Sequence, residues 1–179
     1  MQESEMAKLS SWELRLREAQ YFYLQFLAHC GPPRDSYFLM ASYFDAFLFA
    51  LVSVEEMVTD ATKVKLKTIE VFRFVKALRN ISMHHSVLAA HAVGAKFVRP
   101  FVRHVTELVG AGSIGSAKLA LNYTKFREIF DAIEIERPAE KTTLDIARAY
   151  LSKLEAGPQP VFIESVLAHA QSSVEAVVP

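Results

Sequence analysis

The chain has 179 residues, and its 20 basic side chains balance 20 acidic ones. Hydrophobic residues make up 51% and charged residues 22%, which is typical of a globular protein with a substantial core. Zero net charge excludes a uniformly basic coat for nucleic acid. A single cysteine, Cys30, excludes an internal disulfide, and the acidic start lacks the order of a signal peptide, so we expect a cytoplasmic protein.

The first 60 residues contain two expected helices. Residues 4–29 carry apolar side chains at steps of three and four, and the Pro pair at 32–33 ends this pattern. Residues 36–59 are apolar nearly all round, which is typical of a central core helix or a membrane span. Asp45 lies in the middle of this segment, where a membrane would penalise it by about 3 kcal/mol. We therefore expect a buried bundle helix and no membrane partner.

The middle of the chain contains two more expected helices, at 63–78 and 83–93. Between them we expect the chain to break at Asn80 and to restart at Ser82, a good N-cap residue. Residues 96–110 resemble an edge strand interrupted by Pro100, and a glycine-rich loop follows. Residues 117–136 are expected to form a short strand and then a helix.

The last two expected helices are at 144–154 and 161–174. The expected architecture is therefore one mainly α domain over 1–179. It has a helical core at 8–95, an irregular or β-hairpin insertion at 96–136 and C-terminal helices at 137–179.

Charge is distributed unevenly along the chain. Residues 61–106 hold nine basic side chains and one acidic, Glu70, whereas both flanks are acidic. The same segment holds four of the six histidines. A basic, His-rich centre indicates a confined site for a phosphate-bearing partner. Lys63, Lys65 and Lys67 are explained equally well as a solvated helix face.

Within this centre, Arg79 is followed by Asn80 and, five residues after the arginine, by His84. An arginine binds phosphate through two parallel hydrogen bonds, and a histidine moves protons near neutral pH. These functions suffice for metal-free cleavage of a phosphodiester by its own 2′-hydroxyl. On one continuous helix the two side chains would diverge by about 140°. A break at Asn80 would let them converge, and the first turn of the next helix would lower the pKa of His84.

This motif, together with the aromatic-rich helix around residues 41–48, resembles the HEPN superfamily over about residues 8–95. The resemblance implies an up-and-down helical bundle that binds RNA, either as a metal-independent endoribonuclease of a toxin–antitoxin or defence system or as a binding module. It implies catalytic roles for Arg79 and His84, with Asn80 shaping the site.

The resemblance also implies a homodimer in which two motifs meet, and an antitoxin or other protein as a partner. His85 is a supporting candidate, and Asp45 or Glu56 matches the acidic residue of the preceding long helix. Ser86 stands where one toxin subgroup, which is modified by its antitoxin, has a tyrosine.

Other interpretations stay open. Arg79 can cap a helix end, with His84 on the surface, and Asp45 can form a structural ion pair with Arg15 or Arg17. The chain can then be a non-catalytic helical dimerisation or protein-interaction module. Gly110, Gly112 and Gly115 match the spacing of a dinucleotide-binding loop, although too few residues follow for that fold. The histidines lack acidic or cysteine partners at ligand spacing, so we expect neither a metal nor another cofactor.

Overall fold

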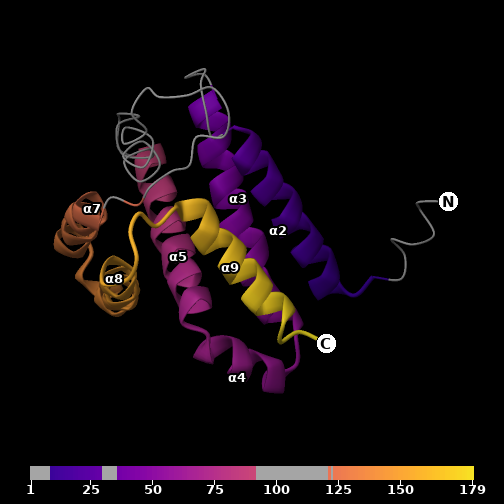
Figure 1. Cartoon of the computed structure of the whole chain (residues 1–179). Helices are drawn as coiled ribbons and strands as arrows, with labels where there is room; N and C mark the ends of the chain where they lie inside the picture. The colour runs from indigo at the N-terminus through magenta and orange to yellow at the C-terminus, as the bar shows by residue number, and fades with distance from the viewer. Residues whose placement is uncertain (1–8, 30–35, 92–120, 122) are drawn as a thin grey trace.

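The computed structural model of the chain describes residues 9–29, 36–91, 121 and 123–179. Within these ranges the chain forms seven α-helices, one short 3-10 helix and no β-strand (Figure 1). The predicted mainly helical class is therefore confirmed. The strand expected at 96–110 and the loop Gly110–Gly115 lie outside the described residues.

The first described helix, α2 (Ser11–Ala28), begins later than the residue expected from periodicity. Ser10 caps it, because the Ser10 side chain accepts a hydrogen bond from the Glu13 amide while the Glu13 carboxylate accepts one from the Ser10 amide at 2.7 Å. This reciprocal pair satisfies two amides that a helix start leaves without partners. The inward face of α2 packs on α3 (Ser36–Met57), where the rings of Phe26 and Phe44 lie 5.8 Å apart.

The second half of α3 is buried nearly all round, including Ser53 and Glu55, as its composition predicts for a central helix. Glu55 is 7% exposed and accepts a hydrogen bond from Lys76 at 2.5 Å. The buried carboxylate is therefore compensated by a cation, without which its burial would be costly. Among the described residues, no helix is long and apolar enough to cross a membrane.

The helices that follow divide at Ile69, and the predicted division at Asn80 is wrong. The helix α4 (Asp60–Thr68) ends at Ile69, whose backbone is extended, and α5 (Glu70–His91) then runs without a break. Two adjacent β-branched residues, Thr68 and Ile69, favour an end to the helix here. The Thr68 hydroxyl donates to the Lys65 carbonyl, which satisfies part of that end.

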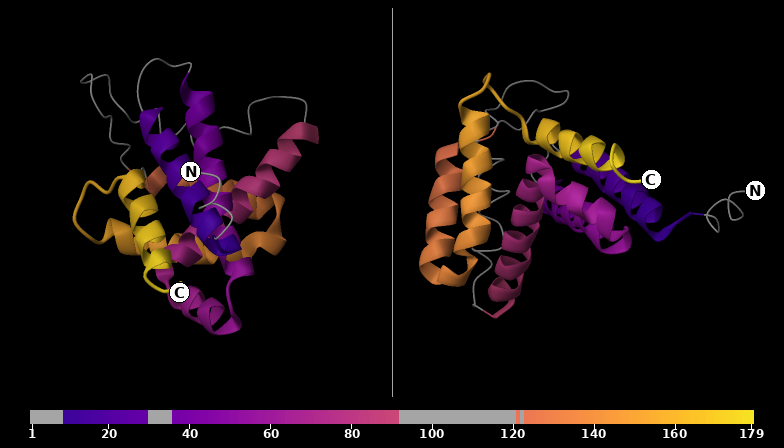
Figure 2. Two further views of the ribbon diagram at one scale, coloured as in Figure 1. Left: turned by 90° about the vertical axis from the view of Figure 1, so that its right-hand side faces the viewer. Right: turned by 90° about the horizontal axis from the view of Figure 1, so that it is seen from below.

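The last helix, α9 (Ile163–Glu175), lies against both α5 and α2 and completes a ring of four helices, α2, α3, α5 and α9 (Figures 1 and 2). Its buried side chains recur at the three- and four-residue steps of one helix face: Ile163, Val166, Leu167, Ala170, Gln171 and Val174. The five apolar ones belong to the same hydrophobic core as the buried side chains of α2, α3 and α5. The C-terminal segment therefore forms part of the bundle.

A helical hairpin lies outside this ring. It consists of α7 (Tyr123–Glu136), a 3-10 turn η1 (Pro138–Glu140) and α8 (Lys141–Glu155). Figure 2 shows the α7–α8 pair on one side of the bundle, with its axes across those of α2 and α9. It packs on α5 through α8, where the Tyr150 ring stacks on Phe74 at 4.8 Å. Arg148 of α8 pairs with Glu134 and Asp131 of α7 and so ties the hairpin together.

We expect Leu167→Ala in α9 to lower the free energy of unfolding by about 2–5 kcal/mol, because Leu167 is fully buried and its removal leaves a cavity. Ile135→Ala is the matched control, since Ile135 is 81% exposed, and should change stability by less than about 0.5 kcal/mol. Urea unfolding followed by circular dichroism measures both. Equal effects of the two changes would contradict the packing of α9 described above.

Candidate functional site

The unbroken course of α5 decides how the Arg79–His84 motif is presented. Five residues along a continuous helix correspond to a rotation of about 140° and a rise of about 7.5 Å. Arg79 and His84 of one chain therefore start from different faces of α5. The side chains of His84 and His85 lie outside the described residues.

Arg79 is half-buried and is held by neutral groups. Its guanidinium lies 5.4 Å from the centre of the Phe49 ring, and its Nη1 donates to the Asn80 side-chain oxygen at 3.2 Å. Its Nε is buried and has no hydrogen-bond acceptor in the described part of the chain. No described carboxylate lies within ion-pair distance of it. The positive charge of the guanidinium is therefore not neutralised by a described carboxylate, whereas Nε itself is enclosed by the protein.

Arg79 lines a surface pocket of about 430 Å³ where α2, α3 and α5 meet. Three pairs of side chains, one pair from each helix, form much of its wall: Arg15 and Glu18, Asp45 and Phe49, Arg79 and Ser82. We call this the Arg79 pocket. Arg79 and Ser82 share it because residues three apart on a helix are neighbours on one face. The structure thus brings together Arg79 and Asp45, two of the residues singled out from sequence.

Asp45 and Ser82 form the polar side of the Arg79 pocket. The Ser82 hydroxyl donates to the Asp45 carboxylate at 2.5 Å, which connects α3 to α5. Burial raises the pKa of the Asp45 carboxyl above its ordinary value, and the hydrogen bond from Ser82 opposes part of that rise. Asp45 as a whole residue is nevertheless exposed, so its carboxyl is not cut off from solvent.

Asp45 forms an ion pair with neither Arg15 nor Arg17 in the described part of the chain: Asp45 is bonded to Ser82, and Arg15 pairs with Glu18 at 2.5 Å. Glu56 is exposed and lies away from the Arg79 pocket, about three turns further along α3 than Asp45. Sequence reasoning assigned Ser82 to a helix cap and did not select Phe49. The spacing of three residues between Ser82 and Arg79 could have indicated that the two share a helix face. Nothing in the sequence pairs Phe49 with Arg79.

This arrangement combines a cation that no described carboxylate pairs with and a carboxyl whose pKa is raised. The cation suits a phosphate oxygen, and the carboxylate suits a hydroxyl whose proton it accepts. Among the residues that the structure describes, no three or more His, Cys, Asp or Glu side chains cluster in a way that could hold a metal ion.

Because its folded-state pKa is raised, Asp45 destabilises the folded protein once it ionises. Below the ordinary value of 3.8 both states are protonated, and the folded state loses stability as the pH rises through the folded-state pKa. We therefore expect Asp45→Asn to unfold at higher urea than the wild type at pH 7, with this difference shrinking toward pH 3.

The matched control for this measurement is Asp60→Asn, in the first turn of α4, where the carboxylate is 97% exposed. It should give no gain at pH 7, because a negative charge there favours the helix start. A difference between Asp45→Asn and wild type that is constant from pH 3 to pH 7 would show that the Asp45 carboxyl is not desolvated.

The chain matches no protein-family model, and it has no significant similarity to a curated protein or to a solved structure.

Proposed function

We propose that the protein is an HEPN-like RNA-binding protein that holds an RNA phosphate at Arg79 and cleaves that RNA without a metal ion. One observation carries the proposal: Arg79 lines a pocket, and within the described residues no carboxylate lies at ion-pair distance from its guanidinium. A phosphate in the pocket would therefore meet an uncompensated positive charge. Other basic side chains, such as Lys76 and Arg148, are already paired.

Because α5 is continuous, the proposed chemistry uses a second copy of the chain. In one chain Arg79 and His84 start about 140° apart, so they do not face one phosphate together. Across a two-fold axis, Arg79 of one copy and His84 of the other can share a substrate. Arg79 then stabilises the charge on the phosphate, His84 moves the proton of the 2′-hydroxyl, and Asn80 holds the guanidinium in place.

The acidic flanks of the sequence and the acidic residues of the Arg79 pocket limit which nucleic acids the protein can bind. Asp45 and Glu18 lie in the same pocket as Arg79, and the chain as a whole has no net charge. Broad binding of long duplexes depends on many basic contacts, whereas the described lining of this pocket has two basic residues, Arg15 and Arg79. A short single-stranded target with an accessible 2′-hydroxyl suits the pocket better.

The test is cleavage of single-stranded RNA in EDTA. We expect Arg79→Met and His84→Ala each to abolish cleavage, and Arg79→Met to weaken RNA binding roughly 10- to 100-fold. Arg73→Met is the matched control, because Arg73 is an exposed arginine of α5 outside the Arg79 pocket, and it should leave both unchanged. If Arg73→Met and Arg79→Met weaken RNA binding and cleavage equally, the effect of Arg79 comes from overall positive charge and not from a specific phosphate site.

Mixing the two inactive variants tests the composite site. Random pairing of equal amounts of Arg79→Met and His84→Ala chains should restore about a quarter of wild-type cleavage, because half the dimers are mixed and each has one intact site. Unchanged cleavage by His84→Ala alone, or no recovery on mixing, would overturn the composite site.

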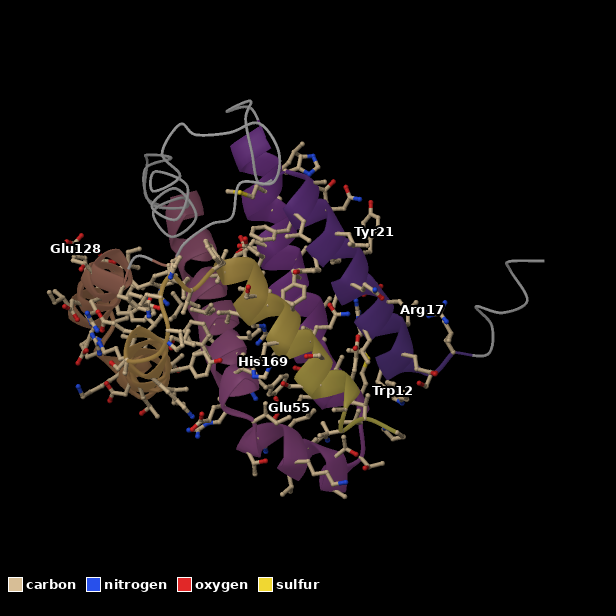
Figure 3. All side chains as sticks on the ribbon, in the orientation of Figure 1. Trp12, Arg17, Tyr21, Glu55, Glu128 and His169 are labelled. Atoms are coloured by element: carbon tan, nitrogen blue, oxygen red, sulfur yellow. The ribbon has the colours of Figure 1, made fainter. Side chains whose placement is uncertain are left out.

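A second candidate function is a non-catalytic helical interaction module, and an apolar stripe on α2 favours it. Leu14, Tyr21 and Leu24 lie seven and three residues apart, hence on one face, and are 45%, 54% and 53% exposed. Figure 3 shows Tyr21 and Arg17 projecting from α2 away from the bundle. Exposed apolar stripes of this kind are typical of helix–helix interfaces.

If this stripe carries the interface, Leu24→Glu should raise the dimer dissociation constant at least tenfold with little change in stability, since Leu24 is exposed. Val64→Glu is the control, because Val64 is 64% exposed on α4. Sedimentation velocity over a range of concentrations measures both. A wild-type chain that stays monomeric at high concentration would contradict self-association through α2. If Leu24→Glu loses both dimer formation and RNA cleavage, the dimer formed through α2 is the one that cleaves RNA.

A further inference from the structure

A second pocket, of about 380 Å³, lies where α5 begins, α8 ends and α9 crosses them. Its wall includes Glu70 at the start of α5, Tyr150 and Lys153 of α8, and His169 of α9, which Figure 3 labels. We call it the Tyr150 pocket. Glu70 and Arg79 are nine residues apart on α5, so the two pockets lie on opposite sides of that helix. The Tyr150 pocket is therefore independent of the function proposed above.

The wall of the Tyr150 pocket is mainly apolar and includes the flat ring of Tyr150. Its apolar side chains are Ile69, Val71, Leu154, Pro158 and Val161. The Tyr150 ring stacks on the buried Phe74 with 29° between the ring planes, so Phe74 fixes its orientation. The volume is at the small end of ligand sites and equals that of about twelve water molecules.

The polar groups of the Tyr150 pocket are mainly donors. The Tyr150 hydroxyl and the His169 ring have no hydrogen-bond partner in the described ranges 9–29, 36–91, 121 and 123–179. Burial, and secondarily the negative charge of Glu70, raise the pKa of the Tyr150 hydroxyl, so it keeps its proton and donates. Lys153 supplies a third donor and forms an ion pair with the Glu70 carboxylate. A ligand that meets these groups must therefore accept hydrogen bonds.

We propose that the Tyr150 pocket binds a small planar aromatic molecule that carries a carboxylate at one edge. The aromatic ring lies on Tyr150 against the apolar wall. The carboxylate oxygens accept from Tyr150, His169 and Lys153. This binding places a ligand between α5, α8 and α9, the contact that joins the α7–α8 hairpin to the bundle.

Benzoate is the probe, and saturation-transfer NMR with titration of the full chain measures its binding. We expect a dissociation constant in the millimolar range or tighter. Cyclohexanecarboxylate, which lacks the flat ring, should bind at least threefold more weakly, and benzylamine, which replaces the acceptor by a cationic donor, should not bind. Equal or tighter binding of benzylamine, or no binding of benzoate up to about 10 mM, would overturn the proposal.

Variants assign the binding to this pocket. Tyr150→Phe keeps the ring on Phe74 and removes only the hydroxyl, so benzoate should bind roughly 2- to 10-fold more weakly. Tyr123→Phe is the matched control, because that hydroxyl donates to Gln159 outside the pocket, and it should leave benzoate binding unchanged. Thermal unfolding confirms that both variants are folded. Equal affinities of wild type, Tyr150→Phe and His169→Ala for benzoate would place benzoate elsewhere and overturn the proposal. That result would leave the proposed RNA cleavage at the Arg79 pocket untouched.

Discussion

The rest of the fold depends on one constraint: α3 is apolar nearly all round. A helix of this kind is stable in water only if neighbours cover it on several sides. In this chain α2 and α5 pack directly on α3, and α9 bridges α2 and α5. The C-terminal helix is thus needed to complete the ring that buries the centre of the molecule.

The same requirement positions the candidate site. Coverage of α3 by α2 and α5 places Asp45 and Phe49 of α3 beside Arg79 and Ser82 of α5. Buried charge elsewhere in the core is paired, as Glu55 is with Lys76. Arg79 differs because a ring and an amide hold it, which leaves its charge for a ligand. This contrast between paired and unpaired cations supports the proposal that Arg79 binds phosphate.

Much of the helical arrangement could be predicted from local patterns. The helices α2, α8 and α9 follow the period of their apolar residues, and α3 follows a nearly continuous apolar run. The expected ends differ from the observed ones by at most three residues, except that α2 begins at Ser11 and not at residue 4. The division between α4 and α5 could not be predicted in this way. Asn80 and Ser82 are good cap residues, but α5 continues through them because Leu78 and Ile81 are buried and Ser82 bonds to Asp45. Tertiary packing thus outweighed the local capping preference.

The sequence alone determined that the chain is mainly helical, that one helix is central, and that positive charge gathers around Arg79, because periodicity and charge order are local properties. Only the tertiary structure decided which residues share a pocket with Arg79. A continuous α5 places Ser82 on the same face as Arg79, and the packing of α3 on α5 adds Asp45 and Phe49. The Tyr150 pocket has the same origin, since its walls come from segments about 100 residues apart, which only the closing of α9 and α8 over α5 brings together.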